Sequence, residues 1–359
     1  MKYKIFASDE GFGHLVRQQA ILDELRRLSP GIEATLQTKR HAHAAKWIFD
    51  NVNLIERYNN ITWAKTKVGT PDLEKIRSYY YDYLSRSENY IKSETDDINK
   101  YNFIISDFVY EAFPIAIRDN LPAFGVAHIT WDWFFSKLYP VPVSTEILDR
   151  LRNYAMSADR LYFPPFTPLD IINTYKSKVK EVPLIVRKCN PQIKVEENDA
   201  FKVQIIDSGA GILSNNFKQA LKQAKDMDDF LFFVSESIGV DNDNIIKIGQ
   251  KELLLDYIPF VDLVIARGGF NVISECIAYR TPLLLLGEAL NPEMESNLYN
   301  IKQEGLGSFI SLQSITNNFK EILYRFIDGE YNIIKQNMEN HSLNSNGARI
   351  IAEDILNQL

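Results

Sequence analysis

Short apolar runs alternate with helical patterns along the first third of the chain. Residues 3–8 form one such run, and the segment after it carries apolar residues at helical spacing. A second run at 103–106 precedes a helical pattern that ends near Arg118, and residues 121–127 resemble the next strand. This alternation predicts a parallel α/β sheet with helices on both faces.

A second series of the same kind follows in the C-terminal half. Apolar runs at 201–206, 230–234, 261–265 and 282–286 are separated by polar or helical segments. The last helix is expected at 347–358, where apolar residues again recur at helical spacing. The pattern predicts two similar halves, each of the nucleotide-binding α/β type.

Between the two series, prolines interrupt the regular patterns over residues 139–191. A chain of 359 residues is also long for a single core, because domains commonly contain roughly 100–200 residues. We therefore predict an N-terminal domain at 1–190 and a C-terminal domain at 191–340.

Charge and cysteine content narrow the function. The formal net charge of −7 argues against a nucleic-acid partner, which requires a dense basic face. Cys189 and Cys276 are the only cysteines and have no metal-ligand spacing, so neither a disulfide framework nor a zinc site is expected. Without a signal-peptide pattern or an apolar run near the ~20 residues that span a bilayer, the expected location is the cytoplasm, with peripheral contact at the inner membrane face allowed.

The most informative motif lies between an apolar run and a predicted helix. Gly268 and Gly269 open that helix, where backbone N–H groups can approach a phosphate at the positive end of the helix dipole. Glu275 follows within the helix and can accept hydrogen bonds from the vicinal hydroxyls of a ribose. This arrangement is typical of a nucleotide-diphosphate site. The alternative for Glu275 is an ordinary exposed helix residue.

A second candidate site follows the first strand. Gly11, Phe12 and Gly13 precede His14, which is suited to act as a general base that deprotonates a hydroxyl. Asp107, at the end of another predicted strand, can hold the imidazole in one tautomer and stabilise its charged form. The alternatives are a tight turn for the glycines, an acceptor-binding or capping role for His14, and a helix N-cap for Asp107.

These motifs, in this order, resemble the glycosyltransferases of the GT-B fold, especially the lipid-linked N-acetylglucosaminyltransferase of peptidoglycan assembly. Besides the two sites, the resemblance rests on residues 280–287, 293–297 and 304–307. It implies an α/β fold of two Rossmann-like parallel-sheet domains facing a cleft. It also implies that a final segment, 341–359, crosses back to the N-terminal domain.

The resemblance assigns the donor nucleotide sugar to the C-terminal domain and the acceptor to the N-terminal domain. His14 and Asp107 would be catalytic. The expected donor-binding residues are Ser208, Gly209, Gly211, Arg267, Gly268, Gly269, Asn271, Glu275, Glu293 and Asn297. The expected acceptor-side residues are Gly11, Phe12, Gly13, His128 and Trp131. The alternatives are a simple turn for residues 208–211, a near-core histidine for His128 and core packing for Trp131.

The resemblance implies transfer of a sugar from a nucleotide diphosphate donor, with a UDP-sugar expected, to an acceptor hydroxyl on a sugar, a lipid-linked or a small molecule, as in cell-surface glycan biosynthesis. No cofactor is expected, and the lone Asp241-Asn-Asp243 segment is read as a polar turn, so we expect no metal. A nucleotide-sugar hydrolase of the same fold is a second hypothesis. A catalytically silent binding protein is a third, because Met294 stands where many relatives carry an amide that grips the sugar.

Overall fold

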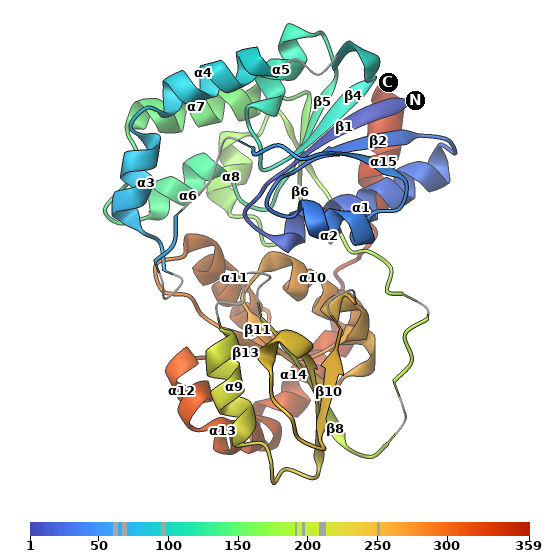
Figure 1. Ribbon diagram of the computed structural model, residues 1–359, viewed down its shortest axis with the longest axis vertical. Coiled ribbons are helices and arrows are strands. Elements are labelled where there is room, and N and C mark those ends of the chain that lie inside the picture. The colour runs from blue at the N-terminus through green and yellow to red at the C-terminus, as the bar shows by residue number, and fades with distance from the viewer. Residues whose placement is uncertain are drawn as a thin grey trace. The chain divides into compact units, whose positions relative to one another are not determined.

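The fold was analysed in a computed structural model, which describes residues 1–59, 64–66, 70–94, 98–190, 192–195, 198–207, 213–249 and 252–359. Contacts between Cα atoms divide the chain into two compact units (Figure 1). The N-terminal unit contains Met1–Arg187, Leu290–Glu293 and Ser345–Leu359, and the C-terminal unit contains Lys188–Ala289 and Met294–Asn344. The predicted boundaries at residues 190 and 340 stay predictions.

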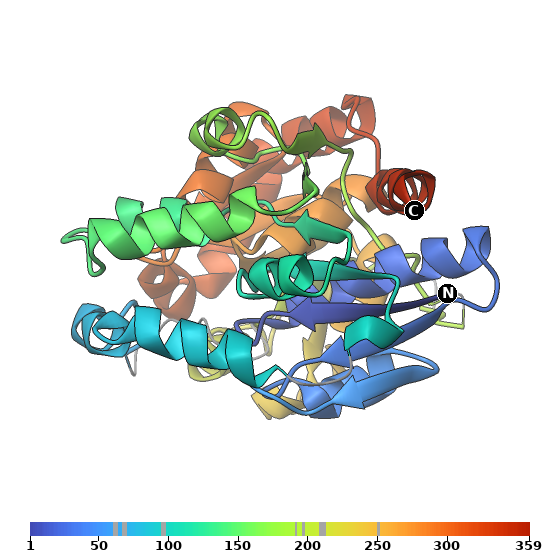
Figure 2. The same ribbon diagram turned by 90° about the horizontal axis from the view of Figure 1, so that it is seen from above.

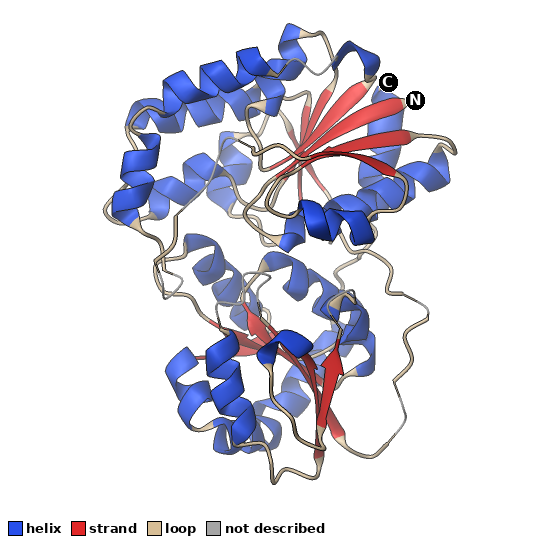
Figure 3. Cartoon of the chain, in the orientation of Figure 1, coloured by secondary structure: helices blue, strands red, loops and turns tan. Residues whose placement is uncertain are grey.

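The described part of the N-terminal unit is built on a parallel sheet with the strand order β3-β2-β1-β4-β5-β6-β7 (Figure 3). The strands are β1 (Lys2–Ala7), β2 (Glu33–Gln37), β3 (Val52–Ile55), β4 (Phe103–Asp107), β5 (Ala123–Val126), β6 (Arg160–Phe163) and β7 (Val179–Glu181). Ile5 of β1 pairs with Leu36 on one side and Ile105 on the other. Such continuous apolar strands are expected where helices cover both faces of a sheet.

Helices surround this sheet in groups that contact one another. Helices α4, α5 and α7 pack together, α6 contacts α7, and α1 contacts both α2 and α15 (Figure 2). The helices of this unit are α1 (Phe12–Leu28), α2 (Ala42–Ile48), α3 (Leu73–Tyr80), α4 (Tyr83–Ser93), α5 (Ala112–Arg118), α6 (Trp131–Lys137), α7 (Thr145–Met156), α8 (Leu169–Thr174) and α15 (Gly347–Gln358), with a 3₁₀ turn at Ile98–Lys100. The apolar faces of α3 to α8 form one core around residues such as Phe113, Phe135 and Leu151.

The last helix returns to the N-terminal unit, as the resemblance implied. Gly347 at the start of α15 donates its backbone N–H to the Leu184 carbonyl over 3.0 Å. A Cβ atom at this glycine would stand 2.1 Å from the Pro183 carbonyl oxygen, so only glycine permits the approach. Farther along the helix, Asp354 accepts a hydrogen bond of 2.7 Å from the Tyr162 hydroxyl. These contacts fasten α15 beside the sheet and against α1.

The C-terminal unit has a parallel sheet with the order β10-β9-β8-β11-β12-β13 among its described residues. Its strands are β8 (Phe201–Ile206), β9 (Phe230–Ser235), β10 (Ile245–Ile248), β11 (Leu263–Arg267), β12 (Leu283–Leu286) and β13 (Gly307–Ile310). Its helices are α9 (Ser214–Lys222), α10 (Phe270–Tyr279), α11 (Pro292–Gln303, whose first two residues group with the N-terminal unit), α12 (Leu312–Asn317), α13 (Phe319–Phe326) and α14 (Asn332–Asn340). Short 3₁₀ turns lie at Glu236–Ile238 and Leu254–Phe260, and a π-helical turn lies at Ile327–Tyr331.

The middle of the chain differs from its prediction. The prolines of residues 139–191 were expected to interrupt regular structure, yet this stretch contains α7, β6, α8 and β7. Pro140, Pro142, Pro164, Pro165, Pro168 and Pro183 all lie in the connections between these elements. Proline is tolerated at such positions because its missing N–H breaks no internal hydrogen bond there. Across the described ranges, none of the helices is long and apolar enough to cross a membrane.

Candidate functional site

Two neighbouring strands of the N-terminal unit bring His14 and Asp107 together. Ala7 at the end of β1 pairs with Asp107 at the end of β4. The chain leaves β1, and α1 begins at Phe12, so His14 lies in the first turn of that helix. Because both strands are parallel, their carboxyl ends share one edge of the sheet. His14 Nδ1 lies 2.7 Å from Asp107 Oδ1.

The Asp107 carboxylate is fully buried and has three side-chain partners: the partly exposed His14, and Arg17 and Gln18. Arg17 donates from Nε to Oδ2 over 2.9 Å and from Nη2 to Oδ1 over 2.5 Å, and Gln18 donates to Oδ2 over 2.8 Å. Burial raises the pKa of Asp107, but the charge of Arg17 and the hydrogen bonds from His14 and Arg17 outweigh it and hold the pKa well below its usual range. Asp107 is therefore a permanently ionised group that orients the imidazole.

The backbone after Asp107 is unusual. Phe108 has a φ of 67°, in the left-handed region that bulky residues rarely adopt. The Ser106 hydroxyl braces this turn, since it accepts a hydrogen bond of 3.2 Å from the Val109 N–H and donates one to the Val109 carbonyl. The Phe108 ring then lies 5.3 Å from the His14 ring. Strained residues of this kind cluster at functional sites, which supports a functional role for this edge.

Asp9, in the loop between β1 and α1, holds the loop after β2 close to the start of α1. Its buried carboxylate accepts hydrogen bonds from the Thr38 hydroxyl and from the backbone N–H groups of Lys39, Arg40 and Asn59, over 2.8–3.0 Å. The sequence did not reveal this role, because the partners are 29 to 50 residues away.

This loop places His41, the N-cap residue of α2, near the site. Its ring lies 4.9 Å from the Phe12 ring. Burial lowers the pKa of His41 to about 4, although the Asp9 carboxylate opposes this shift. His41 is therefore neutral at physiological pH.

We expect His41 to make folding depend on pH. Its folded pKa of about 4 lies below the ordinary value of 6.5, so the unfolded chain takes up the proton first and stability falls as the pH decreases from about 6.5 to about 4. His41→Gln should make the free energy of unfolding, measured by urea titration at pH 7 and pH 5, fall less on acidification than in the wild type. His43→Gln, on the exposed side of the same helix, is the matched control and should leave the difference unchanged. A wild-type response in His41→Gln would contradict the assignment.

His128, in the loop after β5, is a second buried histidine of the N-terminal unit. Its Nε2 lies 3.0 Å from a carboxylate oxygen of Glu293, a residue that groups with the same unit. Burial lowers the pKa of His128, although the Glu293 carboxylate opposes this shift. Burial raises the pKa of Glu293, but the interaction with His128 outweighs it, so that the pKa of Glu293 is lowered. Glu293 was predicted as a donor-side residue, and its observed partner is an acceptor-side candidate.

Trp131, the other acceptor-side candidate, is 3% exposed at the start of α6. Its indole Nε1–H donates to the Phe108 carbonyl over 2.9 Å, and its ring stacks on Phe135. This is the environment of a core residue. Through this hydrogen bond, Trp131 stabilises the turn at Phe108, the residue that directly follows Asp107.

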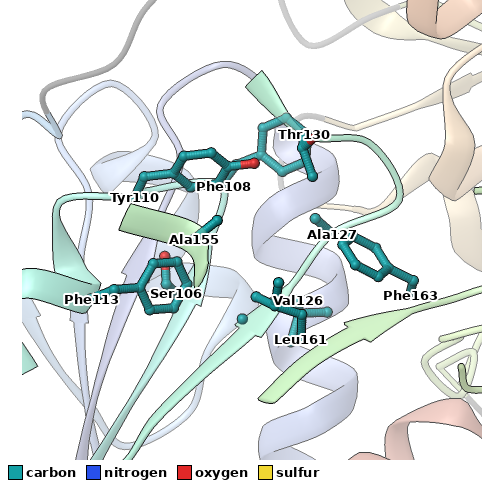
Figure 4. A pocket seen from close by; sticks show the side chains of 11 residues that line it. Ser106, Phe108, Tyr110, Phe113, Val126, Ala127, Thr130, Ala155, Leu161 and Phe163 are labelled. Carbon is teal, nitrogen blue, oxygen red and sulfur yellow. The ribbon is translucent and has the colours of Figure 1, made fainter. Parts of the chain in front are cut away.

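Behind this turn lies a small pocket whose lining is almost entirely apolar (Figure 4). Its volume is about 10 Å³, close to the minimum of roughly 10–15 Å³ that one water molecule needs. Figure 4 shows the aromatic rings of Phe108, Phe113 and Phe163 around it. The pocket is a packing gap beneath the sheet edge and is too small for a sugar or a nucleotide.

The C-terminal unit contains the predicted glycine pair at a strand end. β11 ends at Arg267, and Gly269 is the N-cap residue of α10. Asn297 of α11 donates from Nδ2 to the Gly268 carbonyl over 2.9 Å, which fixes the turn between strand and helix. This turn leaves the first amides of a ten-residue helix at the carboxyl edge of the sheet, where an anion would be favoured.

Two further donor candidates lie in α10. Asn271 is its second residue and is half-buried. Glu275 is 2% exposed, which excludes the alternative of an ordinary exposed helix residue.

Ser208, Gly209 and Gly211 lie outside the described residues. The two ends of their loop are tied together, because the Asp207 carboxylate accepts a hydrogen bond of 2.8 Å from the Ser214 hydroxyl.

Arg267 has partners that the sequence did not predict. Its guanidinium is buried and forms an ion pair with Glu288, which follows β12. Nη2 also lies 3.9 Å from the Met294 sulfur. The guanidinium charge is thus balanced within this unit.

Within the described ranges, no group of three or more His, Cys, Asp or Glu side chains is arranged to hold a metal ion. The expectation that the protein works without a metal stays a prediction.

Three solved structures show which known proteins this chain is similar to. The glycosyltransferase of kitacinnamycin is 13% identical with a TM-score of 0.66, and the alignment covers 100% of this chain and 98% of that one. The glycosyltransferase SnogD from Streptomyces nogalater is 12% identical, covers 100% and 99%, and has a TM-score of 0.64. Spinosyn rhamnosyltransferase SpnG, solved with thymidine diphosphate, is 12% identical, covers 99% and 100%, and has a TM-score of 0.63.

The chain has the GT-B fold. This confirms the predicted fold class, with two Rossmann-like parallel sheets and a final helix that packs against α1. Neither a family model nor a curated protein matches the sequence. None of these three structures is of the peptidoglycan enzyme, so the specific likeness to that enzyme stays a prediction.

Sequence reasoning missed Arg17 and Gln18 in the N-terminal unit. A signal for Arg17 was present, because residues three apart in a helix lie on the same face, and Arg17 follows His14 at that spacing. Its partner Asp107 is 90 residues away, and no local pattern shows that pairing.

Proposed function

We propose that this GT-B protein transfers a sugar from a nucleoside diphosphate donor to an acceptor hydroxyl. The observation that carries the proposal is the buried, ionised Asp107 bound to the partly exposed His14 at the carboxyl edge of the N-terminal sheet. This is the arrangement of a general base with an orienting carboxylate. A binding protein would need neither the ionised partner nor the fixed imidazole.

In the proposed reaction, His14 Nε2 takes the proton from the acceptor hydroxyl. The acceptor oxygen then forms a bond to the anomeric carbon, and the bond from that carbon to the diphosphate breaks with its electron pair on the leaving oxygen. The N-terminal amides of α10 would stabilise the negative charge that develops on the diphosphate. Glu275 would bind the ribose hydroxyls.

The proposed donor is a uridine or thymidine diphosphate sugar, and the proposed acceptor is a small molecule or a lipid-linked glycan. Thymidine is supported by the nucleotide in the similar rhamnosyltransferase, and uridine by the resemblance of the sequence motifs. A thermal-shift assay with uridine, thymidine, cytidine and guanosine diphosphates tests which nucleobase the donor carries. At 100 times its dissociation constant, a ligand specific for the folded state adds about 2.7 kcal/mol of stability.

Glu275→Gln tests the donor site. The loss of a charge-assisted hydrogen bond to ribose is expected to weaken nucleotide binding by about 1.5–3 kcal/mol, measured by calorimetry. Glu321→Gln, an exposed glutamate of α13, is the matched control and should bind as the wild type does. Equal affinity in wild type and Glu275→Gln would remove Glu275 from the donor site.

Product analysis separates the proposed reaction from the other two hypotheses. Transfer predicts that a sugar donor is consumed faster when an acceptor is added, both with and without EDTA. A hydrolase would release free sugar at a rate that no acceptor increases. A silent binding protein would show a thermal shift with the nucleotide but no turnover.

A further inference from the structure

The side chain of Arg17 is not used by the proposed transfer step, yet it lies against both members of the His14–Asp107 pair. Arg17 is 3% exposed and extends from the second turn of α1. Its Nη2 is 2.5 Å from Asp107 Oδ1 and 3.2 Å from His14 Nδ1. Two polar side chains, those of Arg17 and His14, thus meet at one oxygen of the Asp107 carboxylate.

The hydrogen-bond capacity of Asp107 determines where the protons lie. An ionised carboxylate offers about four acceptor positions. Arg17 Nε and Gln18 Nε2 bind Oδ2, and Arg17 Nη2 and His14 Nδ1 bind Oδ1. Arginine keeps its protons, so it can only donate. The carboxylate is therefore saturated with donors, and the contact with His14 requires the proton to be on Nδ1.

That proton position sets the tautomer of the neutral imidazole. With the hydrogen on Nδ1, the lone pair is on Nε2, the nitrogen that points away from Asp107. A base must have its lone pair free for the acceptor hydroxyl. Arg17 and Gln18 thus act through Asp107 to leave Nε2 as the basic atom.

The charge of Arg17 also decides which protonation state of His14 is favoured. With neutral His14, the ionised Asp107 and Arg17 sum to zero charge, and protonation of His14 would add a net positive charge to a mostly buried cluster. Without Arg17, the same protonation would neutralise Asp107 and be favoured, as in an ordinary His–Asp ion pair. A protonated His14 cannot act as a base.

Other charged groups face His14 from the surrounding elements, and none of them replaces Arg17. His41 at the start of α2 and His128 after β5 interact electrostatically with His14, and burial keeps both predominantly neutral by lowering their pKa values. Glu293 interacts with His14 as well, but its carboxylate is already paired with His128. Arg17 is the cation in direct contact with the His14 ring among the described residues.

We propose that Arg17 is a positioning residue that fixes the Nδ1–H tautomer of His14 and keeps its imidazole unprotonated at neutral pH. This inference rests on the proposed role of His14, but it makes a claim about protons that does not need turnover. It assigns to the His14–Asp107 pair a neighbouring positive charge, that of the Arg17 guanidinium, which the sequence motif alone does not include.

The experiment is an NMR pH titration of the protein with ¹⁵N-labelled histidine rings. The chain has five histidines, and His14 is assigned by comparison with His14→Gln. In the wild type, neutral His14 should carry its proton on Nδ1. In Arg17→Met, the pKa of His14 should rise by about one unit or more, because a positive charge next to the ring has been removed. Arg17→Lys keeps the charge and should restore most of the wild-type value.

Gln18→Met is the matched control, since it removes a neutral donor from the same carboxylate. It should change the pKa of His14 less than Arg17→Met does. A wild-type proton on Nε2 would overturn the proposal, and this result needs no variant to fold. An unchanged His14 pKa in a folded Arg17→Met protein would overturn it as well.

The same proteins distinguish failure of this inference from failure of the proposed function. In an active enzyme, the acid limb of the pH profile of kcat/KM should move upward in Arg17→Met together with the NMR titration. If no sugar donor is turned over but the tautomer and the pKa change as expected, the transferase proposal fails and the role of Arg17 stands. If sugar is transferred but neutral His14 carries its proton on Nε2, the proposed role of Arg17 fails and the transferase proposal stands.

Discussion

His14→Ala is expected to lower kcat for sugar transfer by about 10²–10⁴-fold, the usual contribution of a general base. The imidazole is 15% exposed beside a fully buried Asp107, so its removal takes away the proton acceptor and leaves the carboxylate in place with Arg17 and Gln18. The candidates for binding the nucleotide, Gly268, Gly269 and Glu275, lie in the other unit. Stabilisation by nucleoside diphosphate in a thermal-shift assay should therefore persist in the variant.

The control for this experiment is His43→Ala. His43 is an exposed histidine of α2, so it matches the chemical change without touching Asp107. Its kcat should equal that of the wild type. A loss of less than about tenfold in His14→Ala would leave the base unassigned, and His128 would then be the next histidine to replace.

The second large effect concerns folding. Glu94→Gln is expected to lower the free energy of unfolding by about 3–5 kcal/mol, because breaking a fully buried ion pair leaves one charge without compensation. Lys4 of β1 and Glu94 are both inaccessible to solvent, and Lys4 Nζ lies 2.7 Å from Glu94 Oε1. Arg57 also contacts Glu94, over 3.1 Å. Urea unfolding at neutral pH measures the change.

An exposed ion pair between β1 and β2 provides the comparison. Lys2 and Glu33 are 2.9 Å apart, but both side chains are more than half exposed. Glu33→Gln should therefore change stability by only about 0–1 kcal/mol. The double variant Lys4→Met/Glu94→Leu should recover most of the loss, since apolar side chains can replace a buried pair. Similar losses in Glu94→Gln and Glu33→Gln would show that burial does not control the energy of this pair.

Local patterns predicted the central strands of both sheets because these strands are short apolar runs, whereas they did not predict strands towards the sheet edges such as β7. The predictions at residues 3–8, 201–206 and 347–358 correspond to β1, β8 and α15. The pattern of apolar residues that identifies each of these elements lies within a segment of six to twelve residues. Hydrophobic periodicity is a local signal, and here it was sufficient.

Contacts between distant residues were harder to predict. His14 and Asp107 could be paired in advance because both follow strands of one predicted sheet. The loop held by Asp9, the ion pair of Arg267 with Glu288 and the bidentate contact of Arg17 could not, because each depends on which side chains the folded sheet edge brings together. The sequence motifs thus indicated the candidate base, while its electrostatic surroundings required three-dimensional coordinates.

The packing of α15 against α1 has a consequence for synthesis on the ribosome. Helix α1 carries His14 and Arg17, and its neighbour α15 follows the second domain in the sequence, with Ile351, Ala352 and Ile355 buried. Translation is vectorial and domains usually fold as they emerge. Here part of α1 stays uncovered until the second domain and α15, which follows it in the sequence, have been translated. A stalled or prematurely terminated nascent chain would therefore expose an apolar surface to chaperones and proteases.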